Sequence, residues 1–299
     1  MPNLFQNLAP LGDSVVWGQG LLKEQKYFSL VAASLNVNPA NIIQGLAHSG
    51  ADIGRGQTKT GSLCHGEVPT GIPTIFQMLQ SVPGKFPPKT LVLLSGGIND
   101  LGVERIVNPI TSKSDIRRMT DQFCRVDMMA LIGAVLTKLS DQDSRIVVTN
   151  YFPILSEDSV NDVGIDRLLN LQRLTVGTHV SFNLPGMTRS FIVSQVVDQC
   201  LLFWRESNTA LNAAVRTFPS GQVLFADNGF KEENAMFATR PLIFSPLQTD
   251  PMEAERRGIC NACENNIFKL PFCLKAATGH PNVAGATAYA RAIGRALNA

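Results

Sequence analysis

Short apolar runs alternate with longer amphipathic segments along most of the 299-residue chain, and this alternation limits its fold more than any other feature. The apolar runs occupy residues 8–11, 41–47, 90–95, 145–150 and 222–226. Runs of this length between turn residues are typical of buried strands, and parallel strands are buried on both faces by the helices that connect them. The pattern predicts an α/β domain built on a parallel sheet.

Apolar residues at helical spacing fill the intervals between these runs. They predict helices over residues 21–35, 72–79, 115–139, 194–218 and 282–297. Two stretches, residues 156–189 and 228–278, show no sustained period, and we interpret them as loop inserts, which in compact domains usually serve as lids or binding elements. We therefore expect one domain over residues 1–299 with two inserts.

Charge and hydropathy exclude several classes of protein. The 26 Lys and Arg residues nearly balance 24 Asp and Glu residues, and no basic run provides the phosphate-neutralising patch of a nucleic-acid binder. No apolar stretch approaches the ~20 residues of a membrane-spanning helix. The N-terminus lacks the basic flank and apolar core of a signal peptide, which slightly favours the cytoplasm and leaves a secreted mature form open. The sequence does not fix the oligomeric state.

Six cysteines are too few for a disulfide scaffold, but Cys260, Cys263 and Cys273 cluster in sequence. A structural zinc site usually has four ligands, and no fourth ligand stands at a finger-like spacing. A redox Cys-x-x-Cys motif would open a helix after a strand, whereas residues 256–269 are polar and resemble a loop. We favour structural cysteines, reduced or disulfide-paired, over a redox-sensitive pair or a metal site, and expect no metal and no cofactor.

Familiar nucleotide and protease motifs are absent from the sequence. Gly18-x-Gly20 is followed by Lys23 where a dinucleotide fingerprint has its third glycine, and no P-loop, His-Glu-x-x-His or Gly-x-Ser-x-Gly motif occurs. Four polar motifs remain at the predicted ends of strands and helices, where open α/β sheets place their sites. They are Gly-Asp-Ser at 12–14, His-Ser-Gly at 48–50, Gly-Ile-Asn-Asp at 97–100 and Gly-His-Pro-Asn at 279–282.

These motifs supply the groups that acyl transfer needs: a nucleophile, a base and donors for an oxyanion. Ser14 stands in a strand-to-helix turn, and His280 can take its proton. The N–H groups of Ser14 and Gly50 and the side-chain amide of Asn99 could converge on one oxygen, and a glycine at position 50 allows a close approach of the backbone. Each motif alone is an ordinary turn or helix cap. Together, in this order, they predict acyl transfer.

The ordered set also resembles the SGNH hydrolases, or GDSL-type lipases and esterases. The resemblance implies a three-layer α/β/α fold with a five-stranded, flavodoxin-like parallel sheet. It implies hydrolysis of small carboxylic esters through an acyl-enzyme on Ser14, with His280 as general base. It assigns the oxyanion hole to Ser14, Gly50 and Asn99, and requires no metal or organic cofactor. The matches span residues 12 to 285.

One position departs from this family's pattern. An Asp normally stands three residues before the catalytic His and orients its ring, but that position is Ala277 here. A main-chain carbonyl, an acid of the second insert (Asp250 or Glu264), or no group at all could take its place. We favour the main-chain carbonyl of Ala277 or Thr278, which would still fix the tautomer of His280.

Three alternatives to a lipase or esterase remain open at this point. One is a carbohydrate O-acetyl esterase, since enzymes acting on acetylated sugars belong to the same family. Another is a non-catalytic binding protein with a decayed site, for which Ala277 is the evidence. The third is a redox or metal protein centred on the clustered cysteines. For an esterase, we expect the pocket walls to include Trp17 and residues 182–191 and 237–246.

Overall fold

A four-stranded parallel sheet in the order β1-β2-β3-β4 forms the centre of the protein. The computed structural model describes residues 4–61, 63–70, 72–176, 188–263 and 270–299. The strands are β1 (Asn7–Gly12), β2 (Thr90–Ser95), β3 (Arg145–Thr149) and β4 (Val223–Ala226). All six residues of β2 are buried, because helices cover both faces of the sheet. The four corresponding strand predictions are confirmed.

The fifth strand expected over residues 41–47 is not a continuous strand. Within the described residues this segment makes two isolated parallel bridges to β1, one from Ile42 to Leu8 and one from Ala47 to Gly12. Between the bridges, Gly45 has a positive φ of 79°, which is outside the range of an extended strand. The segment therefore runs alongside β1 without completing a five-stranded ladder.

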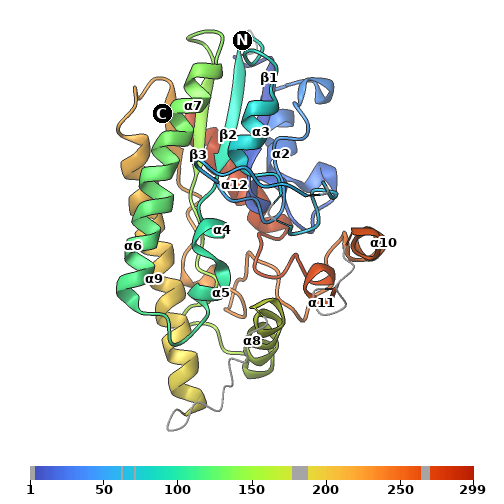
Figure 1. Ribbon diagram of the computed structural model, residues 1–299, viewed down its shortest axis with the longest axis vertical. Coiled ribbons are helices and arrows are strands. Elements are labelled where there is room, and N and C mark those ends of the chain that lie inside the picture. The colour runs from blue at the N-terminus through green and yellow to red at the C-terminus, as the bar shows by residue number, and fades with distance from the viewer. Residues whose placement is uncertain (1–3, 62, 71, 177–187, 264–269) are drawn as a thin grey trace.

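Helices connect the strands and extend beyond the sheet (Figure 1). Before β2 lie α1 (Ser14–Trp17), η1 (Lys23–Gln25), α2 (Tyr27–Ser34), η2 (Pro39–Asn41) and α3 (Ile75–Ser81). Between β2 and β3 lie α4 (Ile98–Leu101), α5 (Val103–Ile106), α6 (Lys113–Thr120), the π-helical η3 (Asp121–Asp127) and α7 (Met128–Lys138). The remaining helices are α8 (Asp162–Val176), α9 (Arg189–Val215), η4 (Glu232–Asn234), α10 (Glu253–Cys263), α11 (Leu270–Leu274) and α12 (Val283–Leu297).

These helices form layers on the two faces of the sheet. Helices α2 and α12 pack against each other and against the sheet, and α7 and α9 pack together on the opposite face (Figure 1). The single helix expected over residues 115–139 is a continuous run of α6, η3 and α7. This arrangement gives the α/β layering that the sequence predicts, with four strands in place of five. Among the described residues, no helix combines the length and apolarity required to cross a membrane.

The interpretation of the two inserts as loops is wrong in part, because each contains helix. Helix α8 forms in the first insert, and α10 and α11 form in the second. Helix α11 packs against both α8 and α10, and Figure 1 shows the three grouped together beyond the sheet. The loop expected over residues 256–269 is helical up to Cys263, and its remaining residues to 269 lie outside the described residues.

Candidate active site

Ser14 and His280 meet at the carboxyl end of β1. Ser14 is the first residue of α1, and the preceding Asp13 caps this helix by accepting a hydrogen bond from the Val15 N–H at 3.0 Å. His280 lies just before Asn282, the residue that caps α12. His280 Nε2 lies 2.7 Å from Ser14 Oγ, which is hydrogen-bonding distance. The two ends of the chain thus place a hydroxyl against an imidazole, as the sequence predicts.

Hydrogen bonds from two side chains fix the carboxylate of Asp13, the residue before Ser14. Its carboxylate accepts hydrogen bonds from Ser95 Oγ at 2.9 Å and from the Tyr151 hydroxyl at 2.8 Å. Tyr151 in turn accepts the Ile98 N–H at 3.1 Å, so one phenol links the first motif to the helix that carries Asn99. Burial raises the pKa of Asp13, and the hydrogen bonds from Tyr151 and Ser95 oppose this effect. We therefore assign Asp13 a structural role.

Three hydrogen-bond donors line the same pocket as the Ser14 hydroxyl. The Asn99 amide donates to the Ala51 carbonyl at 2.9 Å, and its second N–H has no acceptor in the described part of the chain. The main-chain N–H groups of Ser14 and Gly50 likewise find no acceptor among the described residues. Gly50 has a φ of 75°, a conformation that favours glycine. Ser14, Gly50 and Asn99, the three residues expected to form an oxyanion hole, therefore line one pocket.

Asp100, next to Asn99, fixes the loop that faces the pocket. Its carboxylate accepts hydrogen bonds from the Ile53 N–H at 2.8 Å and the Gly54 N–H at 3.2 Å. Burial raises the pKa of Asp100 to about 6. The sequence motif indicated Asp100 only as part of a helix cap, whereas in the structure its carboxylate also binds the main chain after the second motif.

The His280 ring lies in an environment that favours its neutral form. Burial lowers the pKa of His280 to about 4, against the opposing effects of Glu67 and of the Ala277 and Thr278 carbonyls. Nδ1 is buried and has no hydrogen-bond partner among the residues that the structure describes. The Ala277 carbonyl accepts the main-chain N–H of His280 at 3.0 Å. The ring is therefore free of charge and ready to accept a proton at neutral pH.

Of the two acids considered for the missing third position, Asp250 forms no hydrogen bond to the ring in the described structure. Both oxygens of Asp250 bind the Arg256 guanidinium, and one also accepts the Met252 N–H at 3.0 Å. Glu264 lies outside the described residues. Asp250 is therefore a partner of Arg256 and makes no direct contact with His280.

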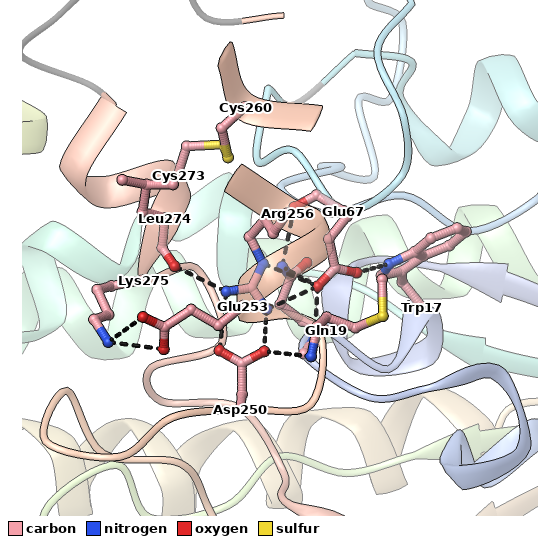
Figure 2. A network of polar contacts seen from close by, with 12 residues as sticks. Trp17, Gln19, Glu67, Asp250, Glu253, Arg256, Cys260, Cys273, Leu274 and Lys275 are labelled. Carbon is pink, nitrogen blue, oxygen red and sulfur yellow. Dashed lines mark hydrogen bonds and ion pairs between the residues drawn. A yellow bond between two sulfur atoms is a disulfide. The ribbon is translucent and has the colours of Figure 1, made fainter. Parts of the chain in front are cut away.

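A buried polar network that the sequence did not predict lies beside this site (Figure 2). Glu67 accepts hydrogen bonds from Trp17 Nε1 at 2.7 Å, from the Gly20 N–H at 2.8 Å and from Arg256 Nε at 3.1 Å. It also accepts one from Gln19 Nε2 at 3.0 Å. Glu67 stands in a segment without regular secondary structure and belongs to none of the recognised motifs, so no sequence signal marks it.

A disulfide joins Cys260 of α10 to Cys273 of α11, with their Cα atoms 6.0 Å apart. The favoured interpretation of structural, disulfide-paired cysteines therefore holds for these two residues. Within the described residues, no group of three or more His, Cys, Asp or Glu side chains is arranged to hold a metal ion. The disulfide fastens the helical part of the second insert next to the pocket.

Apolar side chains form most of the pocket wall around the Ser14 hydroxyl. They come from α5 and the residue after it, the segment after β3, α8 and α11, and include Val103, Val107, Phe152, Ile154, Leu168 and Phe272. Trp17, expected in the wall, instead packs beneath Lys26, whose Nζ lies 3.7 Å from the ring centroid. Residues 237–246 are not part of the described lining, and 182–187 lie outside the described residues. The expectation is therefore wrong for Trp17 and for residues 188–191 and 237–246, and it stays a prediction for residues 182–187.

Comparison with known proteins identifies a similar fold. No protein-family model matches the chain, and no curated protein matches it. The crystal structure of phospholipase A1 from Streptomyces albidoflavus NA297 is similar, with a TM-score of 0.55 over 98% of this chain and 99% of that chain. The two sequences are 12% identical, so the likeness establishes a shared fold and nothing finer.

Proposed function

We propose that this protein is a serine ester hydrolase of the SGNH type that cleaves carboxylic esters through an acyl-enzyme on Ser14. The observation that carries the proposal is the 2.7 Å contact between Ser14 Oγ and His280 Nε2. An alcohol is a weak nucleophile until a neighbouring base takes its proton, and a neutral imidazole at this distance is such a base. The likeness to a phospholipase A1 in fold supports the same proposal.

The reaction follows from the placement of these groups. Ser14 Oγ attacks the ester carbonyl carbon while His280 Nε2 takes the hydroxyl proton, and the carbonyl oxygen becomes an oxyanion. The N–H groups of Ser14 and Gly50 and the Asn99 amide donate to that oxygen. His280 then gives the proton to the departing alcohol. A water molecule, deprotonated by the same ring, attacks the acyl-enzyme, and the ring returns that proton to Ser14 Oγ as the carboxylic acid leaves.

Orientation of the ring in this proposal depends on neutral groups. We infer that the carbonyl of Ala277 or Thr278 accepts the Nδ1–H when the imidazolium forms. Both carbonyls already favour the protonated ring. A carbonyl stabilises the imidazolium less than a carboxylate would, because it carries no negative charge.

The apolar pocket wall favours an aliphatic acyl group over an acetylated sugar. A sugar needs several polar partners, whereas the side chains of α5, α8 and the segment after β3 present mainly hydrocarbon. A decayed, non-catalytic site is less consistent with the intact contact between Ser14 and His280. A lipid-like ester is therefore the substrate class that the pocket supports best.

A chain-length series of p-nitrophenyl esters tests the proposed function. We expect hydrolysis of acetate to longer acyl esters, with kcat/KM rising beyond acetate because each additional buried CH₂ contributes about 0.8 kcal/mol. Exclusive activity on the acetate ester and on acetylated sugars would favour the carbohydrate esterase. Absence of hydrolysis across the series would favour the binding protein.

Replacing Asn99 with alanine should lower kcat by about 10²–10³-fold, or about 2.7–4 kcal/mol, with the fold retained. The amide is needed most when charge develops on the oxyanion, so KM should change little. Steady-state kinetics on one p-nitrophenyl ester, with circular dichroism to check folding, measures the effect. A rise in KM at unchanged kcat would instead assign Asn99 to ordinary substrate binding.

The acidic limb of the kcat/KM profile should have its midpoint near pH 4, because burial lowers the pKa of His280 from 6.5 to about 4. Activity requires the neutral ring, so it is lost as the pH falls through this value and persists above it. Initial rates between pH 3 and pH 8, with folding monitored at each pH, provide the test. A midpoint near 6.5 would show that the ring is solvated in the free enzyme.

A further inference from the structure

The side chain at the family's acid position is packed against the turn after α1. Ala277 is 2% exposed, and a Cβ built on Gly20 would lie 2.5 Å from the Ala277 Cβ and 3.2 Å from Asp250 Oδ1. A carboxylate at position 277 would therefore enter a tightly packed space that already borders on Asp250. Any negative charge that acts on His280 has to come from another part of the chain.

Glu67, Arg256 and Asp250 form a buried network at this place (Figure 2). Their exposed fractions are 0%, 0% and 5%. Arg256 Nη1 donates to Asp250 Oδ2 at 2.9 Å and to the Leu274 carbonyl at 2.9 Å, while Arg256 Nε donates to Glu67 Oε1 at 3.1 Å. Because Glu67 also binds the Gly20 N–H at 2.8 Å, the network joins the turn after Ser14 to the segment before His280.

Within this network, Glu67 is the carboxylate whose charge acts on the ring. Buried charges act strongly because little water screens them. Glu67 raises the pKa of His280 and Arg256 lowers it, with the effect of Glu67 the larger of the two. Lys26 also faces Glu67, but it interacts with Glu255 as well. The nearby Lys275 is paired with Glu253 at 2.9 Å.

We propose that Glu67 is a positioning residue for the general base: its buried carboxylate, held by Arg256, stabilises the His280 imidazolium in place of the acid absent at position 277. This inference rests on the proposed ester hydrolysis. Arg256 contributes in two ways: its Nε donates to Glu67, and its Nη1 donates to the Leu274 carbonyl at the end of α11. The negative charge thus comes from Glu67, which is distant in sequence and contacts the turn after the helix that begins at Ser14.

A purely structural role for Glu67 predicts different results, and the network offers matched controls. Trp17→Phe removes the 2.7 Å hydrogen bond to Glu67 but keeps the carboxylate and an aromatic ring. Asp250→Asn removes a carboxylate from the same guanidinium, although Asp250 is not among the charges that shift the pKa of His280. Glu67→Gln removes the charge and keeps the shape. In the double variant with Trp17→Phe, the new amide no longer faces the indole N–H.

The experiment compares hydrolysis of p-nitrophenyl butyrate by these four variants and the wild type at pH 4 and pH 7. Loss of the Glu67 charge should lower the His280 pKa by about one unit, so Glu67→Gln should keep roughly nine-tenths of its pH 7 rate at pH 4. The wild type, Trp17→Phe and Asp250→Asn should keep about half, given a pKa of about 4. At pH 7, kcat of Glu67→Gln should fall roughly 10-fold, since the base is weaker.

The proposal is overturned if folded Glu67→Gln keeps the wild-type ratio of the rate at pH 4 to the rate at pH 7 and loses no more activity than Trp17→Phe. If circular dichroism shows that Glu67→Gln is unfolded, the same rate ratio is measured in the double variant of Glu67→Gln and Trp17→Phe, and that value tests the proposal. If both are unfolded, Glu67 is a folding residue and the positioning role is rejected. Wild-type protein without Ser14-dependent hydrolysis would instead reject the proposed function itself, a result that does not depend on any Glu67 variant.

Discussion

Alanine at position 14 should reduce kcat for ester hydrolysis by about 10⁶-fold, the effect that loss of the nucleophile has in well-studied serine hydrolases. Ser14 is the only hydroxyl that lies 2.7 Å from His280 Nε2 in the described structure. Without Oγ, the remaining donors can only assist attack by water, which is worth about 10³–10⁴-fold over the uncatalysed reaction.

Steady-state hydrolysis of p-nitrophenyl butyrate measures this loss. Ser81→Ala is a suitable control, because the Ser81 hydroxyl bonds to the Met78 carbonyl within α3 and lies outside the pocket lining. The control should keep wild-type activity. If Ser14→Ala retained more than about one hundredth of the wild-type kcat while folded, another group would be the nucleophile.

Alanine at position 280 should have an effect of similar size, also about 10⁶-fold, because Ser14 is not activated without the ring. The nucleophile and base act as one unit, so the Ser14→Ala and His280→Ala double variant should lose no more activity than either single variant. The same ester assay measures all three.

His65→Ala is the matched control for His280→Ala. His65 contacts Trp17 edge-on, accepts the Glu67 main-chain N–H at 3.3 Å, is exposed at the surface and does not line the pocket. Its removal should lower kcat by at most about 10-fold, the effect expected of disturbing Glu67, which is far less than the loss expected in His280→Ala. Additive losses in the double variant of Ser14 and His280 would contradict the dyad, because two residues acting separately would then be required.

The sequence predicted four strands of the sheet and the meeting of Ser14 with His280, because both are marked by local patterns. Each of the four strands is a short apolar run, and both Ser14 and His280 follow from motifs at the ends of elements. The prediction of a fifth strand was wrong because Gly45 has a positive φ, which interrupts the extended backbone within an otherwise apolar segment. A single glycine in a strand pattern does not reveal its conformation in advance.

The helices of the inserts and the network beside His280 could not be predicted in this way. Helix α10 buries Arg256 and Cys260 rather than a stripe of large apolar residues. A buried arginine is stable only with charged partners, and one of the two here, Glu67, is 189 residues away, so periodicity carries no information about the pair. The same applies to Tyr151, whose hydrogen bonds join the first and third motifs, and to Asp100, which binds the Ile53 N–H.

Mapping a fluorophosphonate adduct by mass spectrometry shows whether Ser14 is the nucleophile, because this reagent modifies only a serine that a neighbouring base has activated. We expect one adduct, on Ser14, that disappears in the Ser14→Ala and His280→Ala variants. An adduct on any other serine, or no adduct on folded wild-type protein, would contradict this expectation.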